Sequence, residues 1–340
     1  MNAKMIIENG SFKKIPALAR PHGKQFVIIT DAHMKVLGEK LLHAMRQAKL
    51  KCHLILIPAG EKSKSLEFTA EMASSLVKLG LKRDGCLIGL GGGVIGDSAG
   101  FLASIYMRGI AFISVPTTLL AMGDSSIGGK TGVDLPEGKN LLGTFYHPKM
   151  IIMDPLLLLT LPERDFKSGL AEVIKHGIIA DKKFFNFLKK NADKILKREK
   201  ILLKQVVEKS ANIKLRIVRR DEKESLSKAK SSMSRMLLNY GHTVGHALEQ
   251  LSDYTLPHGE AVAIGMVAEN RVAVGRKILK QQDAQMIIEV LKMFGLPTKI
   301  PSKYAPAQIK KALGMDKKHI GGKLHFALPT KIGQAKVVTL

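Results

Sequence analysis

Five side chains of the kind that bind divalent metals lie in three short segments of the second half of this chain. Glu172 and His176 are four residues apart, as are His242 and His246, and His258 follows shortly afterwards. Residues four apart share one face of an α-helix, so each pair can direct both side chains at one point. A catalytic zinc ion takes three protein ligands and keeps one open position. The segments therefore predict a metal site, with five candidates for three positions and a remaining histidine free to transfer protons.

A glycine-rich segment in the first half is typical of a nucleotide-binding loop. Gly91, Gly93 and Gly96 fit the pattern G-x-G-x-x-G after an expected strand at 86–90. Glycines let the backbone approach a pyrophosphate, and a helix N-terminus favours its negative charge. The loop follows the third expected strand, and no acidic residue lies about 20 positions later to hold a ribose. Asp31 can take that role if its strand lies beside the loop; otherwise the motif fits a structural turn equally well.

A second glycine-rich stretch, residues 124–140, carries Lys130 and Lys139. It resembles the end of a P-loop, but that motif needs a glycine where Asp124 stands. We interpret the two lysines, together with Arg108, as an anion pocket for phosphate or carboxylate groups. The alternative interpretation is a turn with solvated lysines.

The elements that must position these groups change character along the chain. Short apolar runs alternate with helical patterns in the first half, which predicts a parallel, doubly wound sheet. The expected strands are 26–31, 54–58, 86–90 and 111–116. The expected helices of the second half are 166–180, 184–198, 201–218, 239–251, 259–279 and 284–294. We therefore expect a Rossmann-like α/β domain over residues 1–158 and an all-α domain over residues 159–340.

The charge of the chain attracts anionic partners, but no motif specifies a nucleic acid. The 340 residues include 54 Lys and Arg against 29 Asp and Glu, a formal net charge of +25. Zinc-finger spacing and basic–aromatic interleaving are absent from the sequence, so we attribute the charge to a lysine-rich solvated surface. No apolar run reaches the roughly 20 residues of a membrane span, and the first residues lack a signal-peptide pattern. Cys52 and Cys86 form no CxxC motif. We expect a cytoplasmic protein with no nucleic-acid or membrane partner.

Several segments, in collinear order over nearly the whole chain, resemble the 3-dehydroquinate synthase family. They are residues 91–97, 106–109, 116–120, 124–140, 171–175, 235–247 and 258–262. The resemblance implies a carbon–oxygen lyase of the shikimate pathway that uses NAD and a divalent metal, Zn²⁺ or alternatively Co²⁺. It also implies an NAD-binding α/β domain, a helical domain that binds metal and substrate, and a homodimer. The implied substrate is 3-deoxy-D-arabino-heptulosonate 7-phosphate, which these enzymes convert to 3-dehydroquinate and phosphate.

The implied reaction is a cycle in which NAD is regenerated. A substrate hydroxyl, made more acidic by the metal, is oxidised transiently to a ketone. The ketone acidifies the neighbouring C–H, so phosphate leaves by β-elimination. Hydride then returns, and the opened sugar closes by an intramolecular aldol step. Basic residues would hold the phosphate and carboxylate in a reactive arrangement.

The resemblance also assigns roles by motif position. The implied metal ligands are Glu172, His242 and His258, while His246 handles protons and His176 becomes a core residue. The implied NAD-contacting residues are Asp31, Glu61, Lys64, Gly92, Gly93, Val94, Asp97, Thr117, Thr118, Lys139 and Thr160. The implied substrate-contacting residues are Arg108, Asp124, Lys130, Asn140, Lys175, Lys214, Arg235, Asn239, His246 and Lys317. The implied catalytic groups are His246, Lys130, Arg108 and Glu224.

Residues 225–234 depart from the family pattern. They add about seven polar residues between the acidic segment at 221–224 and Arg235, as surface loops tolerate. We predict a mobile loop that leaves Arg235 and Asn239 in register.

Three other functions compete with this interpretation. A related sugar-phosphate cyclase that makes inosose or valiolone precursors is the nearest, but residues 128–133 and 139–140 match 3-dehydroquinate synthases. A metal-dependent polyol dehydrogenase would produce NADH and release no phosphate. A basic nucleic-acid-binding protein that has lost catalysis fits the charge, but the full set of site residues opposes it.

Overall fold

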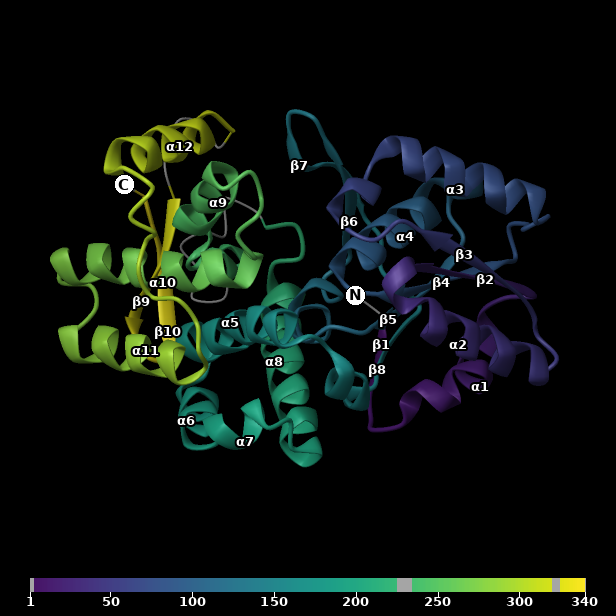
Figure 1. Ribbon diagram of the computed structural model, residues 1–340, viewed down its shortest axis with the longest axis horizontal. Coiled ribbons are helices and arrows are strands. Elements are labelled where there is room, and N and C mark those ends of the chain that lie inside the picture. Colours follow the sequence, from purple (N-terminus) through teal and green to yellow (C-terminus); the bar gives the residue numbers. More distant parts are fainter. Residues whose placement is uncertain (1–2, 225–233, 320–324, 340) are drawn as a thin grey trace. The chain divides into compact units, whose positions relative to one another are not determined.

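The computed structural model describes residues 3–224, 234–319 and 325–339, with no side-chain description for residues 315–319. The loop predicted at 225–234 therefore lies outside the described residues except for Ser234. The chain forms two compact units, Met1–Leu161 and Pro162–Leu340, shown in purple to teal and in teal to yellow (Figure 1). In the described part of the chain, no helix has the length and apolar character needed to span a membrane.

A six-stranded parallel sheet forms the centre of the first unit. Its strand order is β1-β8-β5-β4-β2-β3. The strands are β1 (Lys4–Ile7), β2 (Gln25–Asp31), β3 (Lys51–Ile57), β4 (Cys86–Gly91), β5 (Ala111–Pro116) and β8 (Met150–Met153). The four strands expected from the sequence are present; β1 and β8, each of four residues, were not predicted.

Helices cover both faces of this sheet. They are α1 (Ile15–Ala19), α2 (Lys35–Gln47), α3 (Leu66–Lys78) and α4 (Gly93–Ile105). Along β2, Phe26 and Ile28 pack in the core under α1 and α2, while Val27 and Ile29 pack in the core with α3 and α4. Successive strand residues point to opposite faces, so a strand covered on both sides is apolar throughout.

The stretch that the sequence suggested as a glycine-rich turn contains an antiparallel hairpin. Strand β6 (Lys130–Leu135) pairs with β7 (Gly138–Phe145). Gly132 and Gly143 lie where the two backbones approach closely: a Cβ at Gly132 would lie 2.5 Å from the carbonyl oxygen of Leu142. The glycines in this stretch therefore have a packing role, which the loop interpretation did not anticipate.

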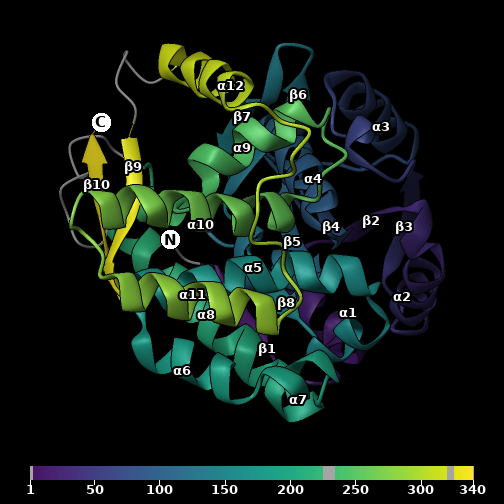
Figure 2. The same cartoon turned by 60° about the vertical axis from the view of Figure 1, so that its left-hand side comes forward.

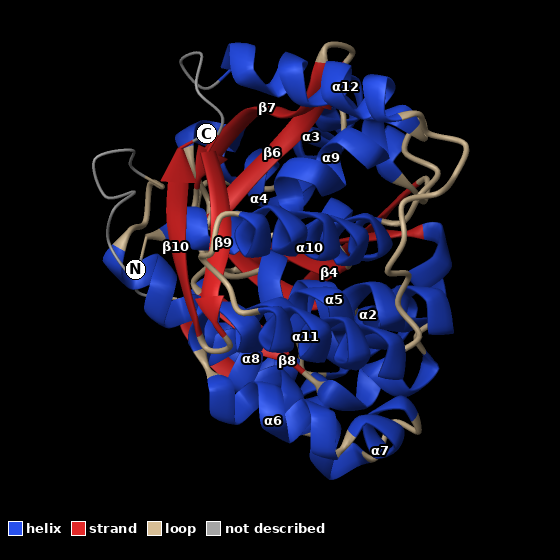
Figure 3. Cartoon of the chain, turned by 90° about the vertical axis from the view of Figure 1, so that its left-hand side faces the viewer, coloured by secondary structure: helices blue, strands red, loops and turns tan. Residues whose placement is uncertain are grey.

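The second unit is mainly helical (Figures 2 and 3). Its helices are α5 (Glu163–Ala180), α6 (Lys182–Lys190), α7 (Ala192–Leu196), α8 (Lys200–Arg220), α9 (His242–Leu251), α10 (His258–Gly275), α11 (Gln281–Met293) and α12 (Pro306–His319). The expected helix at 184–198 is interrupted at Asn191, and the one at 239–251 begins at His242 because Gly241 has a left-handed φ of 83°.

The expectation of an all-α second half needs one correction. Strands β9 (His325–Lys331) and β10 (Gln334–Thr339) form an antiparallel pair near the C-terminus. Phe326, Ala327 and Leu328 are all buried there, and β9 packs against α10. Tertiary packing thus stabilises a hairpin that its local sequence pattern did not identify.

Helix α10 packs against both α5 and α9, and glycines make these contacts close (Figure 2). A Cβ at Gly259 would lie 2.0 Å from the carbonyl oxygen of Ser168 in α5. A Cβ at Gly265 would lie 1.9 Å from the carbonyl oxygen of Gly241 at the start of α9. Only glycine fits at these two positions, so they determine how near the three helices can lie.

Candidate functional site

Three potential metal ligands meet where α5, α9 and α10 come together. Glu172 belongs to α5, His242 is the first residue of α9, and His258 is the first residue of α10. The Glu172 Oε1 atom lies 3.3 Å from His242 Nε2 and 3.2 Å from His258 Nε2. A tetrahedral ion with bonds of about 2.0–2.1 Å has ligand–ligand edges of about 3.3–3.4 Å. The donor set and its spacing therefore fit a zinc-like divalent cation.

The second ring nitrogen of His242 and of His258, Nδ1, also has a hydrogen-bond partner. His242 Nδ1 lies 3.2 Å from the carbonyl oxygen of Tyr240, and His258 Nδ1 lies 3.2 Å from Glu249 Oε2. Both acceptors favour a proton on Nδ1, which leaves Nε2, the ring atom that faces Glu172, as the one that can bind a cation. Such second partners fix the tautomer and orientation of metal-binding histidines.

The charged groups of this cluster shift one another's pKa values. Burial raises the pKa of Glu172, but Lys175 and His242 outweigh burial and hold that pKa well below its usual range. Glu172 and Lys175 are each 1% exposed and form an ion pair within α5. Burial would lower the pKa of His258, but hydrogen bonds to Glu172 and Glu249 raise it to about 10. A cation that binds here therefore displaces a proton from His258.

His246 and His176, the two histidines left open by spacing, lie in different surroundings. His246 is exposed on α9, and its ring centroid lies 5.2 Å from that of His242. With Glu249 and His258 it forms a second group whose ligand atoms lie within 4.8 Å of one another. His176 is fully buried and its Nδ1 lies 2.8 Å from Ser210 Oγ, so it belongs to the packing of α5 against α8.

The start of α9 is held by two neighbouring residues of α10. Glu269 is fully buried and accepts hydrogen bonds from Gly241 N at 2.7 Å and Val244 N at 3.3 Å. Burial raises the pKa of Glu269 to about 8. Tyr240 donates its hydroxyl to Asn270 Oδ1 at 2.7 Å. Glu269 and Asn270 were not among the predicted site residues, although a carboxylate and an amide inside an apolar helix are a signal of such a role.

The predicted substrate residues of the second unit occupy several elements. Arg235 N bonds Asp221 Oδ2 at 2.9 Å, and Asn239 Nδ2 donates to Glu224 Oε1 at 2.6 Å. The segments on either side of residues 225–233 are thus joined, with Glu224 and Asn239 in contact. Lys214 is 6% exposed on α8. Lys317 lies in α12, and its side chain is outside the described part.

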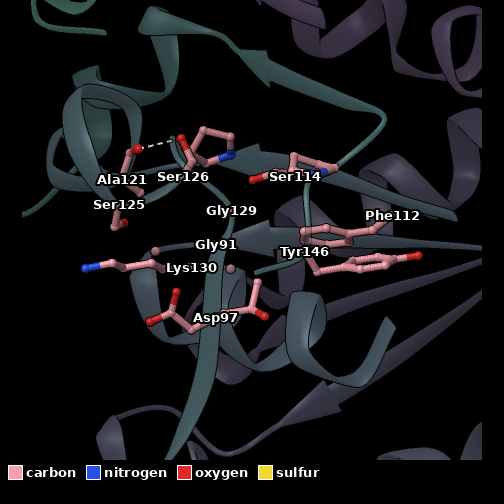
Figure 4. A pocket seen from close by; sticks show the side chains of 15 residues that line it. Gly91, Asp97, Phe112, Ser114, Ala121, Ser125, Ser126, Gly129, Lys130 and Tyr146 are labelled. Atoms are coloured by element: carbon pink, nitrogen blue, oxygen red, sulfur yellow. Dashed lines mark hydrogen bonds between the residues drawn. The ribbon is translucent and has the colours of Figure 1, made fainter. Parts of the chain in front are cut away.

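A pocket of the first unit lies at the start of α4 (Figure 4). Its lining residues include Gly91, Gly92, Gly96, Asp97, Ser125, Ser126, Lys130 and Tyr146. Helix α4 begins at Gly93 with Gly92 as its N-cap, and no described side chain caps it. A Cβ at Gly96 would meet no described atom within 4 Å, whereas one at Gly91 would lie 2.6 Å from Ile95. The open helix N-terminus and the open space at Gly96 suit an anionic ligand.

Three other predicted NAD residues lie at the carboxyl ends of β2 and β5, which both pair with β4, and a fourth lies further along the chain. Strand β2 pairs directly with β4, so Asp31, the last residue of β2, lies beside the glycine loop that follows β4. The Asp31 carboxylate accepts a hydrogen bond from His33 N at 2.9 Å. Thr117 is buried after β5, Thr118 Oγ1 accepts from Ala121 N, and the exposed Thr160 ends a short 3₁₀ helix.

A polar network joins the loop after β3 to the hairpin. Lys64 is 4% exposed, and its Nζ lies 2.7 Å from Asp97 Oδ2 and 2.5 Å from Asn140 Oδ1. Asp134 Oδ1 accepts from Asn140 N at 2.8 Å and its own N donates to the Lys64 carbonyl. Lys139 Nζ lies 3.7 Å from Glu61 Oε1. The network contains four predicted NAD-contacting residues and Asn140; Asp134 was missed.

The backbone before β5 contains a strained turn. Met107, Arg108 and Gly109 have successive φ values of 48°, 66° and 113°. Non-glycine residues in this region each cost about 1–3 kcal/mol, and such strain clusters at functional sites. Asp124 lies in a π-helical turn, Ala121–Ser125, of the kind also frequent at functional sites.

The fold and the two sites define a class of enzymes that combine a nucleotide pocket in an α/β unit with a divalent-metal site in a helical unit. A family model described as 3-dehydroquinate synthase N-terminal matches residues 54–168, and one described as 3-dehydroquinate synthase C-terminal matches residues 169–319. The chain therefore belongs to the 3-dehydroquinate synthase family.

Individual relatives agree with this membership. A 3-dehydroquinate synthase of Desulforamulus reducens is 45% identical over 320 residues, covering 94% of this chain and 87% of the relative. A solved 2-epi-5-epi-valiolone synthase of Streptomyces hygroscopicus subsp. jinggangensis 5008, with NAD⁺ and Zn²⁺ bound, is 28% identical, with a TM-score of 0.90 over 100% of this chain and 93% of that one. A solved 2-deoxy-scyllo-inosose synthase shares the fold, with 24% identity and a TM-score of 0.86 over 99% of this chain and 93% of that one.

Proposed function

We propose that this chain is a 3-dehydroquinate synthase, which converts 3-deoxy-D-arabino-heptulosonate 7-phosphate to 3-dehydroquinate and phosphate. The observation that carries the proposal is the Glu172–His242–His258 cluster, whose potential ligand atoms lie within 4.8 Å of one another in a chain 45% identical to a named 3-dehydroquinate synthase. The valiolone and inosose synthases share the fold, but the one with the higher identity reaches only 28%.

NAD and a divalent metal, Zn²⁺ or Co²⁺, are the proposed cofactors. The metal would be held by Glu172, His242 and His258 and would lower the pKa of the substrate hydroxyl that is oxidised, while NAD would supply the hydride acceptor. The backbone N–H groups at Gly93 and Val94 would bind the pyrophosphate of NAD at the start of α4. The polar groups after β2, β3 and β5, together with Lys139 and Thr160, would hold the rest of the dinucleotide.

The charged residues of the chain would then hold the substrate and move its protons. We assign phosphate and carboxylate binding to the predicted cations, which neutralise these anions by charge-assisted hydrogen bonds. These cations are Arg108, Lys130, Lys175, Lys214, Arg235 and Lys317. Asp124, Asn140 and Asn239 would orient the hydroxyl groups. His246, exposed and adjacent to the cluster, would transfer the proton that accompanies departure of phosphate, with Glu224 as a second acceptor.

The direct test is phosphate release from 3-deoxy-D-arabino-heptulosonate 7-phosphate by the purified protein, with and without NAD and Zn²⁺, while NADH absorbance is followed. We expect release that requires both cofactors and leaves no net NADH. Turnover of glucose 6-phosphate or sedoheptulose 7-phosphate instead would assign a sister cyclase activity. Net NADH without phosphate release would assign a dehydrogenase.

A homodimer in the cytoplasm is the proposed form of the protein. Leu141 and Phe145 are 51% and 47% exposed on one face of β7, and Ile105 and Met107 are 46% and 41% exposed at the end of α4 and just after it. Apolar side chains beside an edge strand suit contact with a second copy. Light scattering would measure the mass in solution, and cell fractionation would test the location.

A further inference from the structure

Glu249 is a buried carboxylate outside the predicted set of site residues. It is 5% exposed and lies seven residues after His242 on α9, so the two side chains share a face of the helix. Its Oε2 atom lies 3.2 Å from Nδ1 of His258. Nε2 of the same ring lies 3.2 Å from Glu172 Oε1. The imidazole of His258 therefore bridges two buried carboxylates, one on each side.

The backbone around Glu249 is fixed by the turn that leads to His258. The Glu249 carbonyl accepts hydrogen bonds from Ser252 Oγ and Tyr254 N, both at 2.8 Å. Ser252 Oγ in turn accepts from Leu256 N at 3.2 Å. One compact turn thus fixes the backbone of Glu249 close to the start of α10, where His258 lies.

We propose that Glu249 is a positioning residue that fixes the ring orientation and tautomer of His258 for divalent-metal binding. It accepts the Nδ1–H hydrogen bond and leaves the Nε2 lone pair directed at the metal position, as the Tyr240 carbonyl does for His242. The inference rests on the proposed metal-dependent function. A carboxylate in this role also increases the basicity of the imidazole, and loss of such a partner costs about 10–100-fold in metal affinity.

The test uses the full-length protein, stripped of metal and titrated with Zn²⁺ against a competing chelator. Glu249→Gln keeps the size of the side chain and an acceptor oxygen but removes the charge, and Glu249→Ala removes the acceptor. We expect Zn²⁺ affinity to fall about 10-fold in the first variant and up to about 100-fold in the second. Glu208→Gln, which alters only a surface pair with Lys204 on α8, is the matched control and should bind Zn²⁺ like the parent.

Two further readouts separate positioning from a purely structural role. We expect the Tm of the metal-free Glu249→Gln variant to equal that of the parent, while the rise in Tm caused by Zn²⁺ becomes smaller. The visible absorption of the Co²⁺-loaded protein should keep a tetrahedral spectrum, since Glu249 is not itself a ligand in this proposal. Equal Zn²⁺ affinity in Glu249→Gln and the parent, an equal Tm loss with and without metal, or a changed Co²⁺ coordination number would each overturn it.

The proposed function itself fails in a different way. If the parent protein binds no Zn²⁺, both the proposed metal site and the proposed role of Glu249 are refuted. A parent that binds Zn²⁺ but releases no phosphate would leave the role of Glu249 intact and refute the activity.

Discussion

In the cluster of three histidines and one glutamate, the direction of each side chain decides which histidines can bind the metal. His242 and His246 have equivalent spacing in the sequence, yet only His242 directs a ring nitrogen to within 3.3 Å of Glu172. His246 is exposed beside it. Ligand and proton-transfer roles can therefore be separated by experiment.

We predict different defects for substitutions at the two positions. His242→Ala should lower Zn²⁺ affinity on the order of 100-fold or more, because it removes a ligand rather than its support. His246→Ala should keep the parental Zn²⁺ affinity and lower kcat by about 10²–10⁴-fold, as expected for a proton-transfer group. Chelator competition and steady-state kinetics measure the two effects. Loss of Zn²⁺ affinity in His246→Ala but not in His242→Ala would favour the ligand group that contains His246 and Glu249.

Metal affinity should also depend on pH in a direction set by His258. Its pKa in the metal-free protein is raised to about 10, so the ring carries a proton that a metal must displace. We expect Zn²⁺ affinity to rise with pH by up to about tenfold per unit below that pKa and then to level off. Competition titrations between about pH 6.5 and 8.5 would show this slope. A flat profile would mean that His258 is neutral before the metal binds.

At the scale of elements, α10 determines where α9 begins. Glu269 bonds two N–H groups of the first turn of α9, and Gly265 lets the helices approach. The position of His242, the proposed ligand at the start of α9, thus depends on α10, whose first residue is the proposed ligand His258. Helices α9 and α10 therefore supply both the two proposed histidine ligands and Glu269, which fixes the start of α9.

The raised pKa of Glu269 makes a testable contribution to stability. The folded protein binds this proton more tightly than the unfolded chain, so the contribution is full below the ordinary carboxyl pKa and is lost as pH rises toward about 8. We expect Glu269→Gln to remove a slope of up to about 1.4 kcal/mol per pH unit in the free energy of unfolding. Urea unfolding of metal-free parent and variant at about pH 5 and 8 measures it. Parallel pH profiles would contradict the assignment.

Helix α4 offers a test of the nucleotide pocket. Gly96→Ala adds a methyl group to open space, so it should fold normally and gain up to about 1 kcal/mol from helix propensity. Because Gly96 lines the pocket, the same methyl group should weaken NAD binding by about tenfold, the effect of about 1.4 kcal/mol of crowding. Gly275→Ala in α10 also enters open space and serves as control. Unchanged NAD affinity in Gly96→Ala would place the dinucleotide elsewhere.

At the scale of the whole molecule, the exposed apolar face of β7 bears on assembly. Strand β7 pairs with β6 alone among the described strands. Leu141 and Phe145 are four residues apart, so they lie on the same exposed face of β7. We expect the double variant Leu141→Asp, Phe145→Asp to be monomeric, because two charges would have to be buried in the dimer. Sedimentation or light scattering measures this, with Val77→Asp on α3 as an exposed apolar control. A dimeric double variant would place the interface elsewhere.

Features that depend on local residue patterns could be predicted before the structure was known. Apolar runs identified strands β2, β4 and β5 because a strand buried on both faces is apolar throughout, and they also identified the edge strand β3, which is partly exposed. Helical spacing placed the potential ligands on common faces, and the motifs indicated the family to which the chain belongs.

Tertiary structure alone decided what depends on contacts between distant segments. The short strands β1 and β8 and the pair β9–β10 form because partner segments are available, which no local period shows. Residue spacing alone could not choose among the five potential donors, although the family resemblance implied Glu172, His242 and His258. Their convergence depends on three helices whose separation is set by glycines. Glu249, Glu269 and Asp134 were missed for the same reason. Each acts through a hydrogen bond to another segment, and burial makes that bond necessary for a charged group.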